Sequence, residues 1–251
     1  MDLKEEKVII TGAASGFGNH LANYLKDKSN KLILIDINPN LKKQFKNEDN
    51  ISLHLCDLTD FNQTTDVIKE IFHDDSDIRI LINNAGIIHS ELLINFFNKE
   101  DRRHSKSSWD KMLDVNLNSV FNCTVNVADQ MVCRRLKGLI INISSISANG
   151  NAGQSVYSAA KAAVNALTIT WSRELAAFGI RSAGIAPGFF DTPSTHLALK
   201  ENTLNKILSE IPLRKLGQLD DLAKAVEFII QNDYYNGKIL ELDGGLTLSF
   251  G

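Results

Sequence analysis

The sequence has few features that would tie the protein to an oxidising compartment, a membrane or a polyanion. Its three cysteines, Cys56, Cys123 and Cys133, are odd in number and lack CxxC spacing, which favours reduced thiols over a disulfide framework or a metal site. The first residues are too polar for a secretory signal, and no apolar run approaches the ~20 residues of a membrane span. A formal net charge of -3 favours neither nucleic acid nor an anionic membrane. We therefore expect a cytoplasmic protein with small-molecule partners.

The chain also lacks a Gly/Ser-rich linker, an internal repeat or a low-complexity tract, so we expect one domain over residues 1–251. What it has is an alternation of short β-branched runs with longer helical segments. This pattern is typical of an α/β fold: a Rossmann-like, doubly wound parallel sheet of about seven strands with helices on both faces. The expected strands are 7–11, 31–36, 51–56, 78–82, 138–144, 180–185 and 238–241, and the expected helices are 16–28, 59–73, 108–135, 155–178 and 219–231.

Two segments break this alternation, residues 87–107 and residues 193–212. They follow the fourth and sixth expected strands. Because ligands of open α/β sheets lie beyond the carboxyl ends of the strands, both segments are candidate walls of a substrate pocket. Surface loops without a role are the alternative.

Three glycines follow the first strand, Gly12, Gly16 and Gly18, and the last two open a helix. Glycine permits positive φ and lets backbone amides approach a pyrophosphate at the positive end of a helix. The spacing departs by one residue from the usual G-x-G-x-x-G, so its context has to support it. Asp36 supplies that context. It ends the second strand eighteen residues after Gly18, where an acidic group can accept hydrogen bonds from ribose hydroxyls.

The Asp36 carboxylate also bears on the choice between NAD and NADP. An ionised carboxylate repels a 2′-phosphate, and residues 13–17 and 37–40 contain no Lys or Arg that would attract one. Lys42 and Lys43 are the only nearby candidates. We therefore expect NAD rather than NADP.

Two further strand ends carry candidate nucleotide contacts. Asp57 and Leu58 follow the third strand, and Asn84, Ala85 and Gly86 follow the fourth. An Asp at a strand end is often a turn former or a helix cap. Asp57 can have that role and also face an adenine.

Proton-transfer chemistry is indicated where the fifth strand ends and the next helix begins. Tyr157 and Lys161 are four residues apart on one helix face, so the ammonium can act on the phenol. Either Ser144 or Ser145, at the end of the preceding strand, can hold a substrate oxygen. An isolated Tyr-x-x-x-Lys pair would be an exposed pair without function, but this one lies in a nucleotide-binding chain.

Together these motifs resemble the classical short-chain dehydrogenases/reductases over residues 7–251. The resemblance rests on residues 11–18, 83–86, Asn116, Ser144/Ser145, Tyr157–Lys161, 187–192 and 242–245. The 3-oxoacyl-[acyl carrier protein] reductase-like branch is the most similar, from residues 150–154 and 232–245. The resemblance implies a nucleotide-binding half of about residues 1–115, a catalytic and substrate-binding half of about 116–251, and a homotetramer or homodimer.

The resemblance also implies residue roles. Tyr157 would be the proton donor or acceptor, and Lys161 would bind the nicotinamide ribose and lower the pKa of the tyrosine. The serine would polarise the carbonyl, and Asn116 would hold a water of a proton relay. The expected cofactor contacts, from motif and resemblance together, are Gly12, Ser15, Gly16, Phe17, Gly18, Asp36, Ile37, Asp57, Leu58, Asn84, Ala85, Gly86, Tyr157, Lys161, Pro187, Gly188, Phe190 and Thr192.

The chain departs from the family pattern in three places. The usual distance to the tyrosine selects Ser144, whereas the second place in the Ser-Ser pair selects Ser145. We favour Ser145, because a deletion in the following loop is easier than a register shift in a buried strand. Reductases of this branch generally use NADP and have Arg where this chain has Ser15. Residues 87–107 are longer than usual, and their basic residues, Lys99, Arg102, Arg103 and Lys106, suit a solvated surface better than a site for an acidic carrier or a CoA phosphate.

Three hypotheses follow. The leading one is an NAD(H)-dependent oxidoreductase that interconverts a secondary alcohol and a ketone, such as a 3-hydroxyacyl or 3-oxoacyl thioester. The second is an NADPH-dependent 3-oxoacyl-[acyl carrier protein] reductase. The third is a non-catalytic family member that only binds nucleotide, which the joint presence of Asn116, Ser145, Tyr157 and Lys161 disfavours.

Overall fold

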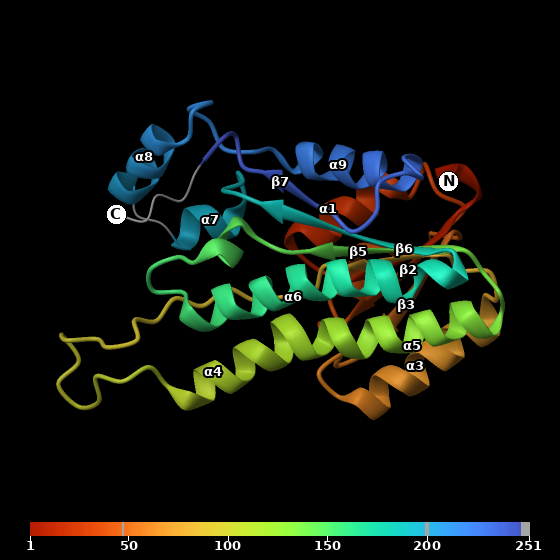
Figure 1. The fold of residues 1–251 in the computed structure, drawn as a ribbon, viewed down its shortest axis with the longest axis horizontal. Coiled ribbons are helices and arrows are strands. Elements are labelled where there is room, and N and C mark those ends of the chain that lie inside the picture. Colours follow the sequence, from red (N-terminus) through yellow and green to blue (C-terminus); the bar gives the residue numbers. More distant parts are fainter. Residues whose placement is uncertain (47, 199–200, 247–251) are drawn as a thin grey trace.

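A computed structural model describes residues 1–46, 48–198 and 201–246 of the chain. Its centre is a parallel sheet in the order β3-β2-β1-β4-β5-β6-β7 (Figure 1). This order reverses direction between β1 and β4, as in doubly wound folds. The strands are β1 Lys7–Thr11, β2 Lys31–Asp36, β3 Ile51–Leu55, β4 Ile80–Asn83, β5 Gly138–Ile143, β6 Ile180–Pro187 and β7 Ile239–Leu242.

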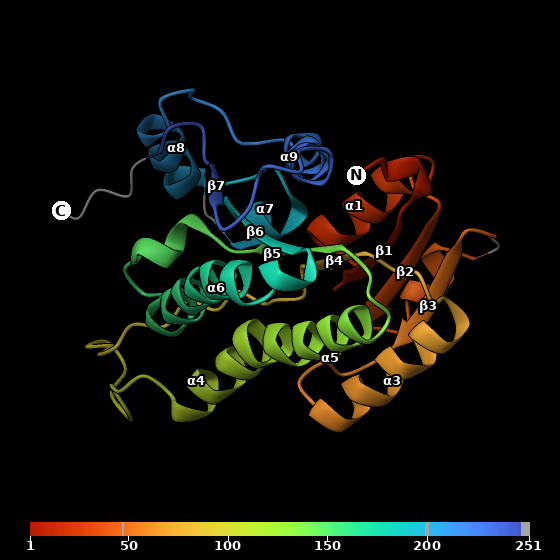
Figure 2. The ribbon, with the colours of Figure 1, turned by 45° about the vertical axis from the view of Figure 1, so that its right-hand side comes forward.

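Helices cover both faces of this sheet (Figure 2). Alternate residues of β1 serve different cores: Val8 and Ile10 pack with α1 and α9, whereas Ile9 packs with α3 and α5. Strands buried on both sides are therefore almost wholly apolar, and the expected fold class is confirmed. The helices are α1 Gly16–Leu25, α2 Leu41–Gln44, α3 Phe61–Asp74, α4 Lys106–Leu113, α5 Ser119–Cys133, α6 Ser155–Glu174, α7 Pro193–Ala198, α8 Glu201–Glu210 and α9 Leu219–Gln231. Among the described residues, no helix has the length and apolar character needed to cross a bilayer.

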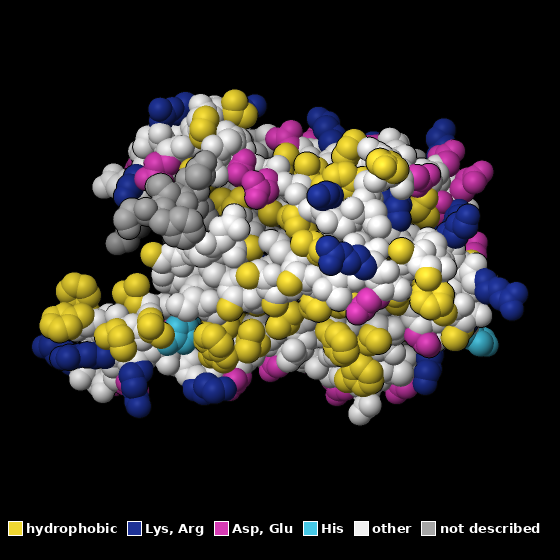
Figure 3. Space-filling view, in the orientation of Figure 1, with side chains coloured by type: hydrophobic (Ala, Val, Ile, Leu, Met, Phe, Trp, Pro, Cys, Tyr) yellow, Lys and Arg dark blue, Asp and Glu magenta, His cyan; other side chains and the backbone are white. Residues whose placement is uncertain are grey.

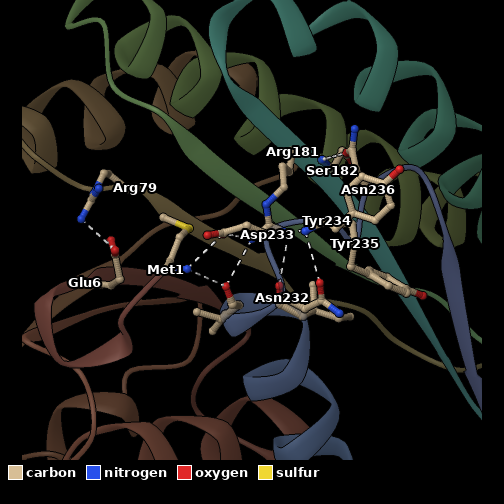
Figure 4. A network of polar contacts seen from close by, with 12 residues as sticks. Met1, Glu6, Arg79, Arg181, Ser182, Asn232, Asp233, Tyr234, Tyr235 and Asn236 are labelled. Carbon is tan, nitrogen blue, oxygen red and sulfur yellow. Dashed lines mark hydrogen bonds and ion pairs between the residues drawn. The ribbon is translucent and has the colours of Figure 1, made fainter.

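Ion pairs fasten the amino-terminal edge of the sheet (Figure 4). The Met1 ammonium lies 3.0 Å from the Asp233 carboxylate, and Arg181 lies 3.3 Å from the same group. Nearby, Arg79 pairs at 2.8 Å with the buried Glu6. These contacts hold the start of the chain against the turn that leads into β7, and they leave the opposite, carboxyl-terminal edge of the sheet to the candidate site.

Two expected segments differ in the structure. The helix expected over 108–135 is interrupted by a π-helical turn, Asp114–Asn118, between α4 and α5. Residues 193–212, expected to be irregular, contain α7 and α8. Leu204, Ile207 and Leu208 of α8 pack on Ile211, and this helical spacing was a readable signal.

Residues 87–105 contain no helix, and residues 93–104 form a hairpin that we call the arm. The Asn95 amide donates to the Arg102 carbonyl at 2.6 Å, and the His104 amide donates to the Leu93 carbonyl at 2.9 Å. In both ribbon views the arm projects beyond the amino-terminal end of α4 (Figures 1 and 2).

Candidate active site

The glycine-rich turn between β1 and α1 is packed too tightly for side chains at Gly12 and Gly18. Gly12 and Gly16 have φ of +67° and +53°. A Cβ on Gly12 would lie 2.7 Å from the Ala85 Cα, and one on Gly18 would lie 2.2 Å from the Gly12 carbonyl oxygen. Ser15 precedes α1 without a side-chain capping bond, so amides of the first turn remain available to an anion. This bare cradle fits a dinucleotide pyrophosphate.

Asp36 lies beside this turn. Its carboxylate accepts hydrogen bonds of 2.8 Å from the backbone amides of Ala14 and Asn38. The group is thereby fixed at the end of β2, next to the exposed Ile37. A carboxylate in this place can accept hydrogen bonds from a ribose.

Asp57 and Leu58 have structural contacts at the end of β3. The Asp57 carboxylate accepts hydrogen bonds from the Thr59 amide at 3.0 Å and from the Thr59 hydroxyl at 2.7 Å. The Leu58 carbonyl accepts from Asn122 of α5 at 3.0 Å. The prediction that Asp57 forms a turn is confirmed, whereas its contact with an adenine stays a prediction.

Asn84 and Ala85 hold the glycine-rich turn against the end of β4. The Asn84 side-chain amide donates to the carbonyl oxygens of Thr11 at 3.0 Å and Gly12 at 3.2 Å. The backbone amides of Asn84 and Ala85 donate to the Thr11 hydroxyl at 3.0 and 3.1 Å. Gly86 then leads into the centre of the site: a Cβ there would lie 2.8 Å from Asn116 Oδ1 and 3.7 Å from Lys161 Nζ.

Tyr157 and Lys161 lie together on the first turns of α6, and both are buried. Lys161 Nζ lies 5.8 Å from the centre of the Tyr157 ring and donates to the Ile143 carbonyl at 2.8 Å. Helical spacing and the end of β5 thus bring together the phenol, the ammonium and the serine pair.

The two serines have different partners. The Ser145 hydroxyl accepts a hydrogen bond from the Ser147 amide at 3.1 Å and lies near enough to the Tyr157 phenol to lower its pKa, whereas the Ser144 hydroxyl donates to the Lys161 carbonyl at 3.2 Å. Ser144 therefore fastens α6 to β5, and Ser145 stands beside the phenol. This geometry agrees with the choice of Ser145 from the sequence.

Burial sets the protonation of both groups. It raises the pKa of the Tyr157 phenol, and the Ser145 hydrogen bond opposes this rise. Burial also lowers the pKa of Lys161 to about 8. The expected lowering of the tyrosine pKa by Lys161 is not seen in the protein alone: burial raises the pKa, and it is Ser145 that opposes this rise.

Asn116 occupies the π-helical turn and is fully buried. Its Oδ1 accepts from the Ile87 amide at 3.1 Å, and its Nδ2 donates to the Met112 carbonyl at 3.0 Å. The side chain therefore joins the segment after Gly86 to α4 at the edge of the centre. Its expected hold on a water remains a prediction.

Residues 187–192 cover the glycine-rich turn from the other half of the sheet. The Gly188 amide donates to the Leu242 carbonyl at 2.9 Å, directly after Pro187. The ring of Phe190 packs edge-on against that of Phe17 at 5.1 Å, and Thr192 follows at the start of α7. The expected cofactor residues of the two halves thus meet across the site.

Comparison with known proteins identifies the family. The family model described as short chain dehydrogenase matches residues 6–203. The chain belongs to this family. Curated relatives include the 3-oxoacyl-[acyl-carrier-protein] reductases FabG of Thermotoga maritima and Buchnera aphidicola, both 34% identical, covering 99% of this chain and 100% of theirs. The Staphylococcus epidermidis enzyme of the same name is 33% identical, covering 97% of this chain and 99% of its own.

Sequence reasoning missed a buried series of hydrogen-bonded side chains beneath the centre of this dehydrogenase. Asn83 and Asn142 are register partners on β4 and β5, and the Asn83 amide donates to Asn142 Oδ1 at 2.9 Å and to the Thr124 hydroxyl of α5 at 2.8 Å. Asn142 donates in turn to the Thr168 hydroxyl of α6 at 2.8 Å. The signal was an Asn in each of two otherwise aliphatic strands. These hydrogen bonds fasten α6, the helix that contains Tyr157, to the sheet.

Proposed function

We propose that this dehydrogenase uses NAD(H) to interconvert a secondary alcohol and a ketone, and that 3-hydroxyacyl and 3-oxoacyl thioesters are its first substrate class. The observation that carries the proposal is the buried Tyr157, which lies beside Ser145 and one helical turn before Lys161. The names of the relatives favour the thioester class.

Tyr157 and Ser145 have different roles in the proposed proton transfer. In the reductive direction the Tyr157 hydroxyl donates a proton to the carbonyl oxygen, and Ser145 donates a hydrogen bond to the same oxygen. Burial raises the pKa of the free phenol and so favours the protonated donor. In the oxidative direction the same phenol, once ionised, accepts the alcohol proton.

Lys161 and Asn116 support this centre. The Lys161 ammonium donates to the Ile143 carbonyl, and its remaining hydrogens can reach a ribose hydroxyl. Asn116 lines the same place beside Gly86 and can hold a relay water. A bound nicotinamide supplies the hydride and, when oxidised, a positive charge near the phenol.

The bare turn at Gly12, Ser15, Gly16 and Gly18 would hold the pyrophosphate. Asp36, with Ile37, would hold the adenosine ribose. Asp57, Leu58 and residues 84–86 would line the adenine and ribose side, while Phe17, Pro187, Gly188, Phe190 and Thr192 would line the nicotinamide side. These assignments follow from the positions described above: one group of residues lies around the ends of β1 to β4, and residues 187–192 face it from the end of β6.

Asp36 favours NAD(H), whereas the resemblance to FabG proteins raises NADPH as the second candidate. Steady-state kinetics with both coenzymes tests the choice. We expect kcat/KM at least tenfold higher with NADH, and Asp36→Asn should narrow this preference about tenfold, because the charge that repels a 2′-phosphate is removed. Equal use of NADPH by the wild type would reverse the assignment.

The substrate class is tested separately, by following NADH absorbance with 3-oxoacyl-CoA thioesters and with simple ketones of equal chain length. Higher kcat/KM for the thioesters supports the proposed class, and a preference for ketones rejects it. Turnover of none of these substrates would favour the non-catalytic alternative.

We further propose a cytoplasmic homotetramer or homodimer. Phe121 and Val125, one turn apart on α5, are 47% and 40% exposed and supply an apolar contact surface for such an assembly.

A further inference from the structure

The Gly-Asn-Ala-Gly-Gln run of residues 150–154 ends in a side chain that joins two elements of the site. Gln154 Oε1 accepts hydrogen bonds from the Ser147 hydroxyl at 2.9 Å and from the Asn151 side-chain amide at 3.0 Å. These two bonds use both lone pairs of the amide oxygen. Gln154 therefore connects the 3-10 turn Ile146–Asn149, which follows β5, to the start of α6.

The backbone of Gln154 is fixed at the same junction. Its carbonyl accepts from the Ser158 amide at 2.8 Å, in the first turn of α6, and its own amide donates to the Asn151 carbonyl at 3.0 Å. A fixed backbone limits the positions that the side-chain oxygen can reach. Oε1 is therefore held near Ser147.

Ser147 connects this junction to the reaction centre. It is buried, and its backbone amide donates to the Ser145 hydroxyl oxygen at 3.1 Å, which makes Ser145 the N-cap of the 3-10 turn. A serine hydroxyl has one hydrogen and two lone pairs. The Ser147 amide occupies one lone pair, so it orients the Ser145 hydroxyl and leaves the hydrogen available to a substrate oxygen.

The nitrogen of the Gln154 side chain faces the segment that leads to the arm. It donates to the Ser90 hydroxyl at 3.3 Å, and the Glu91 amide donates to the Gly153 carbonyl at 2.7 Å. Beyond this contact the apolar side chains of the arm gather at the end of the molecule (Figure 3). Ser90 is exposed, so water competes for its bond, whereas Oε1 meets a buried hydroxyl. The oxygen of Gln154 is thus the atom that bears on the reaction centre.

We propose that Gln154 is a positioning residue of this dehydrogenase: through Ser147 it orients the Ser145 hydroxyl beside Tyr157. This inference rests on the proposed function and extends it to a residue that acts only through its neighbours. Without the Oε1 acceptor, the buried Ser147 hydroxyl has to find another partner, and the 3-10 turn shifts together with the amide that holds Ser145.

Substitutions of Gln154 test the role of Oε1. Gln154→Met keeps the length of the side chain but removes its polar atoms, so kcat should fall about tenfold while KM and the Kd of NADH change less than about twofold. Gln154→Glu keeps the acceptor oxygen and should recover most of the lost kcat. Gln231→Met, at the exposed end of α9, is the matched control and should equal the wild type. A wild-type kcat in Gln154→Met, or equal losses in Gln154→Met and Gln154→Glu, would overturn the proposal.

The pH profile separates positioning from a general loss of stability. Ser145 opposes the rise that burial causes in the pKa of Tyr157. If Ser145 is displaced, this pKa rises further, so the profile of alcohol oxidation should move about 0.5 pH units upward in Gln154→Met. Ser147→Ala removes the same hydrogen bond from its other end, should move the profile in the same direction, and decides the question if Gln154→Met does not fold. An unmoved profile contradicts the proposal.

Hydrogen exchange of the Ser147 amide, followed by NMR on the full chain, needs no turnover. Exchange should be about tenfold faster in Gln154→Met than in the wild type and unchanged in Gln231→Met, because the bond from this amide to Ser145 opens more often. Unchanged exchange in Gln154→Met overturns the positioning role whatever the activity. Faster exchange in a protein that turns over no substrate contradicts the proposed function and leaves the orientation of Ser145 by Gln154 intact.

Discussion

The floor of the candidate site, formed by Tyr157, Lys161 and Asn116, and the arm, which follows β4, are stabilised in opposite ways. On the floor, Tyr157, Lys161 and Asn116 are buried, and Lys161 and Asn116 have hydrogen-bond partners within their own chain. In the arm, the rings of Phe96 and Phe97 are 72% and 90% exposed, although Arg102 stacks over the first of them. The difference is between polar side chains that the fold buries and pairs internally and apolar side chains that it leaves in contact with solvent.

The comparison is tested most severely by removing the Tyr157 hydroxyl. Tyr157→Phe keeps the buried ring but removes the proposed proton donor, so kcat/KM should fall about 1,000-fold while the fold is retained. Steady-state kinetics and circular dichroism check the two parts. Unchanged turnover of an active substrate would show that the floor is not the reaction centre.

A smaller effect is expected from Lys161, whose burial lowers its pKa from 10.5 to about 8. Burying the ammonium costs roughly 3 kcal/mol at pH 7, and the bond to Ile143 offsets about 1 kcal/mol. Lys161→Met should therefore raise the free energy of unfolding by about 2 kcal/mol.

The pH dependence gives the sign of this effect. Between pH 8 and 10.5 the folded wild type releases a proton that the unfolded chain retains. The free energy of unfolding of the wild type therefore rises with pH relative to that of the variant. Urea unfolding at pH 7 and pH 10 measures the difference. A variant less stable than the wild type at pH 7 would show that Lys161 stabilises the floor.

The smallest expected effect concerns the glycine-rich turn. In Gly18→Ala the new methyl group meets the Gly12 carbonyl, so the turn must shift and coenzyme affinity should fall about tenfold. Gly153→Asn is the control, because a Cβ there would lie 3.9 Å from Leu92, Asn tolerates positive φ, and Gly153 is not among the expected coenzyme contacts. Fluorescence titration with NADH compares them, and equal affinities would refute the steric argument.

Most of the fold could be predicted from the sequence, because strands and helices each have a characteristic spacing of apolar residues. Doubly buried strands such as β2 are almost continuous in Ile and Leu, and the spacing of Tyr157 and Lys161 placed them on one helix face. The serine choice also followed from local reasoning, since a strand register determines which of Ser144 and Ser145 faces the phenol.

The remaining features depend on contacts distant in sequence. Thr124 and Thr168 look like ordinary helix residues until the fold brings them to Asn83 and Asn142. The segment containing the arm was interpreted through its basic residues, although Phe96 and Phe97 were the more informative pair. Their exposure could be recognised only once the hairpin was seen to project from the helix layer.

The π-helical turn at Asp114–Asn118 also controls the direction of everything that precedes it. A five-residue turn adds one residue to the helical repeat, and each residue of a regular helix rotates the chain by about 100°. Deleting one residue here would rephase α4 against α5, swing the hairpin around the helix axis and draw the Asn116 side chain away from Gly86. A single local irregularity thus sets both the direction of the projecting hairpin and the position of the buried Asn116 amide beside Gly86.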